Sequence, residues 1–554
     1  MTKISHISFV EVSMIMPIFA SSLNFSPMKS RILLAVLLLT NLLSKAQTIE
    51  VSGIQSGVWD ADTVLVTGNV TVNDVLVINP GTTVLFNDFF SIHVEEDASI
   101  EAIGTEADSI RFTVADTTGF HLFNMGRGGW NGIRLSGAAG SKFAYCRFQY
   151  GKAALDNDQD GGALRIYDCK DIEIGHSTLF CNFSREHGGA LNAEHSTVKM
   201  HDCAVNNNLT YTMIDTVYFM YGGGLRFINC EVELTDTDFR YNDGRSAIGG
   251  AMSIDSCSAK IDRCVFEHNH GVNGAGLYMI RCYDNPCSIT NSLFALNTSE
   301  HFGGGLAISD SSPLVANLTV ADNHSIGVNC GGIFFYQHSS PVLWNCIVYG
   351  NTNYAQLEKP VQMWSWTYDE HAPEFHNCLV QYGLDNISNH EIITVYENCI
   401  DEDPLFNGIA PDEYTIWLNS PCFNAGAADT PAEILEGLDL YGQPRVYDGI
   451  VDIGAIEVDP TGVQENTEKQ SHILIAGNPI TAQSYAEIDL DDACNLSAKV
   501  YSIDGKMLAY KNLGRFLKGT NHIAIGGLFS SMPSGTYILV IQAADKTFVA
   551  KAIR

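Results

Sequence analysis

The sequence predicts an all-β fold, a solenoid of the parallel β-helix type, on two observations. Pairs of glycines recur at nearly constant intervals, and the residues at fixed offsets after each pair are chemically alike. The pairs begin at Gly161, Gly188, Gly222, Gly249, Gly303 and Gly331, with a Gly-Ala-Gly variant at Gly274, and the successive steps are 27, 34, 27, 25, 29 and 28 residues. Such a period is typical of units that stack along one axis.

Short strands make up each unit. Between Gly161 and Asn351 apolar residues alternate with polar ones, and no segment has the three- and four-residue spacing of a helix. Because every coil runs in the same direction, the stacked strands are parallel and about 4.8 Å apart. We therefore expect equivalent residues of successive units to lie directly above one another.

Equivalent positions form columns, three of which we expect to fill the interior. Three residues after the first glycine stand Leu164, Leu191, Leu225, Met252, Leu277, Leu306 and Phe334. Five residues after it stand Ile166, Ala193, Phe227, Ile254, Met279, Ile308 and Tyr336. Eight residues after it stand Cys169, Ser196, Cys230, Cys257, Cys282, Ser311 and Ser339. A column of asparagines, predicted to hydrogen-bond from coil to coil at a bend, contains Asn182, Asn208, Asn242, Asn269, Asn297, Asn323 and Asn351.

The charge balance limits the classes of partner. The chain carries 31 Lys and Arg against 63 Asp and Glu, a net charge of −32. Nucleic acid is therefore excluded as an expected partner, because binding to phosphates requires a basic face. An exported, well-solvated protein fits this balance better. Many of the 15 cysteines fall at repeat-equivalent interior positions, so we expect most of them to be reduced and to act as small apolar fillers.

Residues 1–46 have the features of an export signal. A basic segment at Met28–Arg31 precedes the apolar segment Ile32–Leu43, and a plausible cleavage site lies before Gln47. Because residues 1–27 stand unusually ahead of this signal, Met28 is a possible true start. A membrane anchor at 32–43 is the alternative, but twelve residues are few for a span. No transmembrane segment is expected in the mature chain.

The rest of the chain can be divided into segments by whether the repeat is present. Residues 47–145 are interpreted as an N-terminal cap and the first coils, and residues 146–400 as the repeat coils. The opening stretch, with Gly129–Ile133 after it, resembles the first coils of bacterial right-handed β-helix proteins of the pectin-lyase-like fold. Two insertions, at Tyr211–Tyr221 and after Asn351, are rich in aromatic residues, and insertions in a solenoid project as loops.

The repeat stops at residues 401–457, which we interpret as a closing segment. Four motifs occur there in order: Asp403–Phe406, Ser420–Gly426, Asp439–Arg445 and Asp452–Glu457. Together they resemble the terminal segment of many secreted β-helix repeat proteins, sometimes called a choice-of-anchor segment. The resemblance implies a cap over the last coil. Residues 458–471 are polar and unpatterned, which predicts a linker.

The tail, residues 472–554, again alternates as strands do. It contains the motifs Asn478-Pro479, Val500–Lys506, Gly519–Asn521, Ser534–Tyr537 and Lys551–Arg554. These resemble the C-terminal sorting domains of the type IX secretion system. The resemblance implies a small β-sandwich that the export machinery reads, a host of the Bacteroidota type, and a route through the periplasm to the cell surface or the medium.

A candidate metal site lies just before the first glycine pair. Asp156, Asp158 and Asp160 alternate and precede Gly161, as in the first half of a calcium loop. Position twelve of that loop is Tyr167 in place of a bidentate Glu, so an EF-hand is excluded. Bound Ca²⁺ at a simpler loop and a solvated acidic turn are both retained as interpretations.

Outward residues next to the interior columns are the other site candidates. Arg165 and Arg226 are expected two rungs apart, about 10 Å, with Asn192 between them. Polysaccharide lyases of the resembled fold use calcium and a basic residue, which makes either arginine a candidate base. A salt-bridged exterior is the structural alternative. The candidate ligand-binding residues are Asn192, Tyr278, Tyr218, Trp364 and Trp366.

Two functions are consistent with these residues. The first is a non-catalytic surface or extracellular protein that binds carbohydrate or another surface ligand along its length. The second is a calcium-dependent polysaccharide lyase or hydrolase acting on an acidic glycan. A groove that gathers Arg165, Asn192, Arg226 and the acidic turn would favour the enzyme, and side chains paired on a flat face would favour the binder.

Overall fold

A computed structural model describes most of the chain, and the chain divides into two compact units, residues 1–460 and 461–554. The described residues are 47–459 and 473–554, apart from 124, 213–219, 284, 328–329, 355–359, 369–370, 409–412, 428–429, 448, 477–479, 481–483, 491–492, 503–505, 517, 531, 534 and 544–546. The expected signal peptide, including Met28, lies outside the described residues. Tyr218 and most of the expected linker also lie outside them. Within the described part, no helix is long and apolar enough to cross a membrane.

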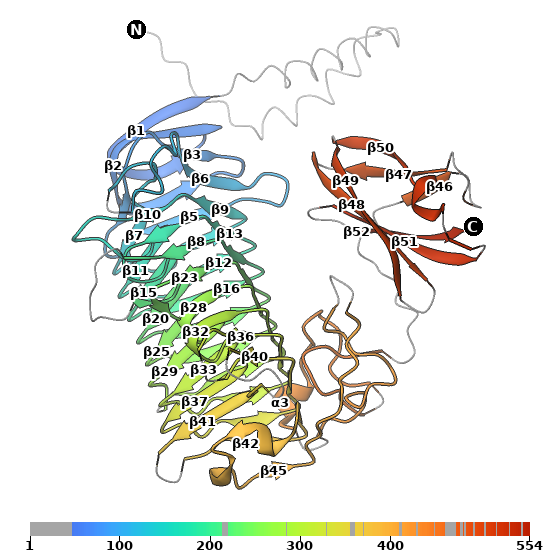
Figure 1. The fold of residues 1–554 in the computed structure, drawn as a ribbon. Helices are drawn as coiled ribbons and strands as arrows, with labels where there is room; N and C mark the ends of the chain where they lie inside the picture. Colours follow the sequence, from blue (N-terminus) through green and yellow to red (C-terminus); the bar gives the residue numbers. More distant parts are fainter. Residues whose placement is uncertain are drawn as a thin grey trace, which may run out of the picture. The chain divides into compact units, whose positions relative to one another are not determined.

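In the first unit short parallel strands stack coil upon coil (Figure 1). The first sheet contains β4 (Ile92–Val94), β7 (Ile133–Ser136), β11 (Leu164–Tyr167), β15 (Leu191–Glu194), β20 (Leu225–Ile228), β25 (Met252–Asp255), β29 (Leu277–Ile280), β33 (Leu306–Ser309), β37 (Ile333–Gln337), β41 (Met363–Thr367) and β44 (Ile387–Ser388). The second contains β5 (Ser99–Ile103), β8 (Lys142–Ala144), β12 (Ile172–Gly175), β16 (Thr197–His201), β21 (Glu231–Thr235), β26 (Ser258–Asp262), β30 (Cys287–Thr290), β34 (Leu314–Ala316), β38 (Val342–Trp344), β42 (Glu374–His376) and β45 (Tyr396–Glu397).

The third sheet follows the second in every coil. It contains β3 (Thr83–Phe86), β6 (Ile110–Val114), β9 (Cys146–Gln149), β13 (Thr178–Phe180), β17 (Ala204–Asn206), β22 (Asp238–Arg240), β27 (Val265–Glu267), β31 (Leu293–Ala295), β35 (Thr319–Ala321), β39 (Ile347–Tyr349) and β43 (Leu379–Val380). A short fourth column contains β10 (Lys152–Ala153), β14 (Phe183–Ser184), β18 (Leu209–Thr210), β23 (Asp243–Gly244), β28 (His270–Asn273), β32 (Thr298–Phe302), β36 (His324–Ser325) and β40 (Thr352–Asn353). The remaining elements are β19 (Met220–Tyr221), β24 (Ala247–Ile248), η1 (Leu384–Asn386), η2 (His390–Ile392) and α3 (Ala432–Leu435).

The first described coils are continuous strands. β1 (Thr48–Trp59) pairs along its length with β2 (Thr63–Ile78), and β2 pairs in turn with β3, β4 and β5. One strand thus passes through all three sheets. Gly53 and Gly57, with φ of 67° and 83°, lie at the two register shifts of β1. Their left-handed backbone lets the strand turn without a loop.

The predicted vertical register is confirmed. Leu191 pairs with Leu225 and Leu225 with Met252, and all three side chains are fully buried in one continuous core. Every strand pair in the first unit's sheets for which a register is given is parallel, as the repeat predicts. The chain is therefore the solenoid that the glycine period indicated.

One coil departs from the predicted columns. Ile333, and not Phe334, pairs with the interior Leu306, while Phe334 pairs with the outward Ala307. Tyr336 likewise pairs with the outward Ser309. The expectation that Phe334 and Tyr336 face the interior was wrong, because the glycine pair at Gly331 sits one position later in its coil than the pairs before it. Two aromatic side chains are thereby placed on the outer face.

The predicted asparagine ladder is present inside the coil. Each Asn from Asn182 to Asn323 donates from Nδ2 to the Oδ1 atom of the next, at 2.9–3.0 Å. The same Oδ1 atoms accept the backbone N–H of the preceding Asn. Gln362 ends the ladder, accepting from Asn351 Nδ2 at 3.0 Å. A buried polar column of this kind is stable because its amides satisfy one another.

The cysteine columns have a hydrogen-bonding role besides filling space. The backbone N–H of Cys169 donates to Ser196 Oγ at 2.9 Å, and that of Cys230 donates to Cys257 Sγ at 3.2 Å. Cys and Ser therefore both occur in one column, because each offers a small acceptor to the coil before it. All 15 cysteines are free thiols in the structure.

The described residues of the closing segment pack along the flank of the third sheet, whereas the resemblance implied a cap over the last coil. Cys422 and Ile453 pack against Ile347 and Leu379, on the outer side of the third sheet. Tyr414 packs there against Leu293. The outward residues of β31, β35 and β39 are apolar except Thr319, which accepts a hydrogen bond from the Ala455 backbone at 3.0 Å, so the closing segment covers this flank along several coils.

The second unit is a small β-sandwich. A three-stranded antiparallel sheet contains β46 (Ile473–Ala476), β47 (Tyr485–Leu490) and β50 (Gly519–Ala524). A four-stranded antiparallel sheet contains β48 (Cys494–Ser502), β49 (Met507–Phe516), β51 (Thr536–Gln542) and β52 (Thr547–Ile553), and η3 (Gly526–Phe529) follows β50. The sheets share a core that includes Leu496, Val500, Ile523 and Leu539.

Candidate functional site

The outer face of the first sheet carries six of the ten predicted site residues. From β4 to β44 its first outward column contains His93, Arg134, Arg165, Asn192, Arg226, Ser253, Tyr278, Ala307, Phe334, Trp364 and Ser388. Two residues further along each strand, the second column contains Ser136, Tyr167, Glu194, Ile228, Asp255, Ile280, Ser309, Tyr336 and Trp366. This face is polar and charged toward the N-terminal coils and aromatic toward the C-terminal ones.

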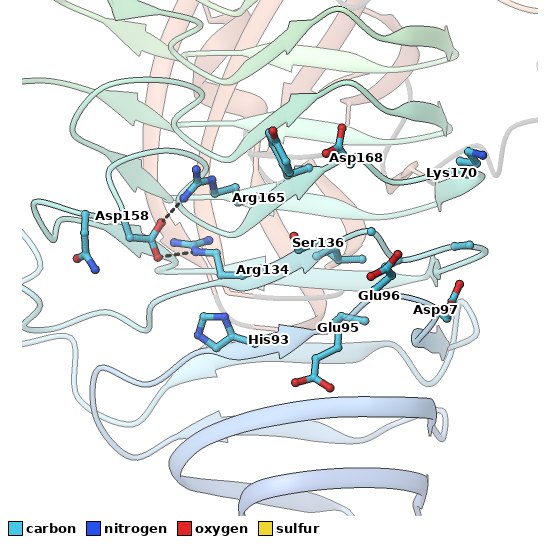
Figure 2. A pocket seen from close by; sticks show the side chains of 17 residues that line it. His93, Glu95, Glu96, Asp97, Arg134, Ser136, Asp158, Arg165, Asp168 and Lys170 are labelled. Atoms are coloured by element: carbon cyan, nitrogen blue, oxygen red, sulfur yellow. Dashed lines mark hydrogen bonds and ion pairs between the residues drawn. The ribbon is translucent and has the colours of Figure 1, made fainter.

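A cavity of about 1130 Å³ lies at the polar end of this face, beside β4, β7 and β11. Figure 2 shows its wall, with His93, Arg134 and Arg165 on successive strands. Its charged lining residues are Glu95, Glu96, Asp97, Asp158, Asp168, Arg134, Arg165 and Lys170. We call it the N-terminal pocket.

Asp158 joins the two arginines of this pocket. Arg134 Nε lies 2.8 Å from Asp158 Oδ2, and Arg165 Nη1 lies 3.6 Å from Asp158 Oδ1, as the dashed lines in Figure 2 mark. Arg134 is buried and also donates to the Gly161 carbonyl at 2.8 Å. Gly132 makes room for its guanidinium, since a Cβ there would collide with Arg134 Nη1. Of the two arginines, Arg165 is the accessible one, with 36% of its side chain exposed.

The three aspartates of the expected calcium loop do not converge. Asp156 is 95% exposed and pairs with Arg185 at 2.7 Å. Asp158 forms ion pairs with Arg134 and Arg165. Asp160 lies beside Glu186 and His187. Within the described ranges, the groups of His, Cys, Asp and Glu that could hold a metal do not include this trio. Each carboxylate is drawn to a different partner, and we do not propose Ca²⁺ at this loop.

Arg226 and Asn192 are held in a network of their own. Arg226 Nη1 donates to Asn192 Oδ1 at 3.2 Å and to Glu194 Oε1 at 3.4 Å, and the guanidinium lies 5.8 Å from the centre of the Tyr221 ring. Asn192 is fully buried and donates to Glu194 at 3.0 Å. Asn192 therefore positions Arg226 and Glu194 and has no surface for a ligand. A guanidinium paired with a carboxylate is also unsuited to act as a base.

Beside this network Asp160, Glu186 and His187 gather, their ligand atoms within 4.8 Å of one another. Burial raises the pKa of Asp160 to about 6, against the opposing charges of Arg165 and Arg226. Burial, helped by Arg226, lowers the pKa of His187 to about 3. His187 Nδ1 accepts the Tyr221 backbone N–H at 3.1 Å, so the neutral ring carries its proton on Nε2. The unprotonated Nδ1 of His187 already accepts a hydrogen bond and is therefore not available to a metal ion.

Aromatic side chains cover the C-terminal half of the face. Phe302 stacks on Phe334 with ring centres 4.4 Å apart, and Tyr336 meets the Trp366 ring edge-on at 5.9 Å. Trp366 is 44% exposed and Tyr368 41% exposed. We call Phe302, Phe334, Tyr336, Trp364, Trp366 and Tyr368 the outer aromatic cluster.

The predicted ligand-binding residues near this cluster differ in their exposure to solvent. Tyr278 is only 8% exposed and packs under the cluster with Phe334, so it supports the patch without reaching a ligand. Trp364 is half-buried and packs against the same group, whereas Trp366 is open to solvent. Tyr218 lies outside the described residues.

Sequence reasoning missed three residues of the face. Arg134 was overlooked although Gly132, two positions before it, marks a cradle for its side chain. Phe334 and Tyr336 were assigned to the interior by the one-residue register difference. In this coil Cys330 occupies the position of the first glycine of the other pairs, and this substitution could have indicated the register difference.

Comparison with known proteins agrees with the fold. The sequence profile of the family described as Right handed beta helix region matches residues 216–402. The first unit has the fold of a right-handed parallel β-helix. Among solved structures, pectate lyase Pel9A is 11% identical, with a TM-score of 0.27 over 74% of this chain and 97% of that one.

The enzymatically active domain of bacteriophage CBA120 tailspike protein 4 is 12% identical, with a TM-score of 0.22 over 87% of this chain and 61% of that one. Neither similarity is strong enough to bear on activity or ligand. No curated protein matches the sequence closely enough to count as a relative.

Proposed function

We propose that this is an exported β-helix protein that binds an uncharged carbohydrate chain along the outer face of its first sheet, without cleaving it. The observation that carries the proposal is the joint presence, on one sheet face, of exposed aromatic rings and a polar pocket. Arg165 and Trp364 belong to the same outward column, seven coil steps apart, which corresponds to about 34 Å. An extended polymer can contact both ends of such a face.

The two halves offer complementary contacts. The C–H faces of sugar rings pack on flat aromatic side chains, and Trp366 and Tyr368 present such surfaces to solvent. Sugar hydroxyls require hydrogen-bonding groups, which Arg165 and the carboxylates of the N-terminal pocket supply. Large exposed apolar rings grouped on one face commonly mark a binding surface.

The charge of the pocket favours a neutral ligand over an acidic one. Five carboxylates line it, against the three cations Arg134, Arg165 and Lys170. Both arginines already face Asp158, and the whole chain carries a net charge of −32. A uronate polymer would be repelled, because like charges oppose approach over several ångströms.

Trp366→Ala is expected to weaken binding about tenfold, or ~1.4 kcal/mol, through loss of ring stacking. The measurement is affinity electrophoresis of the purified protein in gels containing neutral or uronate polysaccharides. Trp417→Ala is the matched control, since Trp417 is a 52% exposed tryptophan in the closing segment. Equal retardation of the two variants, or retention only by uronates, would contradict the proposal.

Cleavage of the polysaccharide is the second candidate function, and Asp160 is the observation that favours it. Its raised pKa of about 6 suits proton transfer, and its Oδ1 atom is buried with no hydrogen-bond partner. The same polysaccharides, incubated with and without Ca²⁺, are assayed for unsaturated products and new reducing ends. Product release that Asp160→Asn abolishes would replace binding by catalysis as the function.

For the second unit we propose the role of a type IX sorting domain. Its support is the compact sandwich formed by the strands between Ile473 and Ile553, together with the tail motifs. Removal of residues 472–554 is expected to leave the protein in the periplasm of a host that has this secretion system, while the Trp366→Ala chain reaches the surface. Surface labelling of intact cells measures this. A truncated chain at the surface would refute the role.

A further inference from the structure

The second sheet places two histidines next to each other in successive coils. Gly175 at the end of β12 pairs with His201 at the end of β16, and the corner residues that follow are His176 and Asp202. His201 Nδ1 lies 2.9 Å from Asp202 Oδ2, and His176 Nδ1 lies 3.7 Å from the same oxygen. The ligand atoms of the three residues all lie within 4.8 Å of one another.

We propose that His176, His201 and Asp202 bind a divalent transition-metal ion of the Zn²⁺ type. In a tetrahedral site with metal–ligand bonds near 2.1 Å, neighbouring ligand atoms are about 3.4 Å apart. The observed separations of 2.9 Å and 3.7 Å lie on either side of that spacing. Two imidazoles and one carboxylate are ligands suited to Zn²⁺, Cu²⁺ and Ni²⁺, and they do not suit Ca²⁺ or Mg²⁺.

Glu173 lies where a supporting carboxylate is needed. When Nδ1 of His201 holds a metal, its proton resides on Nε2, and Glu173 Oε1 lies 3.7 Å from Nε2. The other oxygen of Glu173 is held by Lys142 Nζ at 3.1 Å. A carboxylate that faces the second nitrogen of a ligating histidine fixes the ring and its tautomer.

The two rings are also held by their packing. A Cβ at Gly175 would lie 2.6 Å from His201 Nε2, so a larger residue there would displace the imidazole. The His176 ring stacks on Tyr145, with ring centres 4.6 Å apart and an interplanar angle of 13°. The His176 and His201 rings meet edge-on at 5.2 Å. Small adjustments therefore bring three preoriented ligands around one point.

The site is open on the solvent side. The side chains of His176 and Asp202 are 40% and 47% exposed, so a fourth position is free for water or for a donor atom of another molecule. Its residues follow β12 and β16 of the second sheet, whereas the proposed carbohydrate face belongs to the first. The metal proposal therefore stands independently of the proposed function.

Isothermal titration of the metal-free, untagged protein with Zn²⁺ tests the site. We expect one ion per chain with a dissociation constant in the micromolar range. His176→Gln and His201→Gln are expected to weaken binding more than tenfold, and Glu173→Gln about tenfold. His270→Gln is the matched control, because His270 pairs with Asp243 and Glu300 but belongs to no such group among the described residues. Circular dichroism in metal-free buffer checks that each variant is folded.

A further measurement makes the outcome decisive. Ca²⁺ in place of Zn²⁺ is expected to give no heat at this site. Absence of saturable Zn²⁺ binding, or equal binding by wild type, His176→Gln and His201→Gln, would overturn the proposal, the latter by assigning the ion to thiols elsewhere.

Discussion

Replacement of Arg445 by Met is expected to lower the free energy of unfolding of the first unit by about 3–5 kcal/mol. Arg445 is fully buried in the closing segment, 3.3 Å from Glu457 Oε2, and donates to the carbonyls of Asp452 and Gly454. Asp439, Asp452 and Glu457 are all buried around it. Without the guanidinium these three carboxylates face one another in a medium that solvates them poorly.

The loss is expected to grow with pH. Burial raises the pKa of Glu457 to about 8, with the Arg445 charge acting against the rise. A carboxyl with a raised folded-state pKa keeps a proton that the unfolded chain releases. Its contribution to stability therefore falls as pH rises from its unfolded-state pKa to its folded-state pKa. In Arg445→Met the folded-state pKa rises further, and the deficit relative to wild type increases above about pH 8.

Urea unfolding of the whole protein, followed at several pH values, measures both effects. Arg245→Met is the control, since Arg245 is 62% exposed and its partner Asp243, 26% exposed, also pairs with His270, and its loss is expected to cost about 1 kcal/mol or less. A cost for Arg445→Met no larger than that of the control would mean that the buried carboxylates do not depend on their cation.

Asn269→Leu is the second large effect, expected to cost about 3–5 kcal/mol. Asn269 Oδ1 accepts from both the backbone and the side chain of Asn242 at 3.0 Å. Its Nδ2 donates to Asn297 Oδ1 at 2.9 Å and to the Phe239 carbonyl at 2.8 Å. Leu leaves buried donors and acceptors on both adjacent coils without partners, and the penalty for unsatisfied groups exceeds the value of the bonds themselves.

The comparison variant for this ladder is Asn206→Leu. Asn206 is half-buried and accepts one hydrogen bond, from the Arg240 backbone N–H at 3.0 Å. We expect it to cost about 1 kcal/mol in the same urea experiment. Equal midpoints for the two variants would show that the ladder fills space without contributing its hydrogen bonds.

Part of the candidate site could be predicted from the sequence. The coil period placed Arg165, Asn192 and Arg226 in one column, and the structure has them in that register. Their partners could not be predicted, because Asp158 and Glu194 reach them from neighbouring strands or loops by side-chain rotation. The pairing His176–Asp202 was accessible in principle from a one-coil spacing of 26 residues, but that spacing alone does not show that His201 folds over Gly175.

The repeat in the sequence was enough to predict the solenoid, most of its interior columns and the asparagine ladder, because a periodic chain can bury its periodic residues only by stacking them. The tertiary structure alone decided what each outward side chain does. Exposure and pairing on the outside depend on loops and on single-residue register differences, as for Phe334, Tyr336 and the flank that the closing segment covers. The exposure and pairing of these side chains depend on contacts between coils, and a local sequence pattern does not show such contacts.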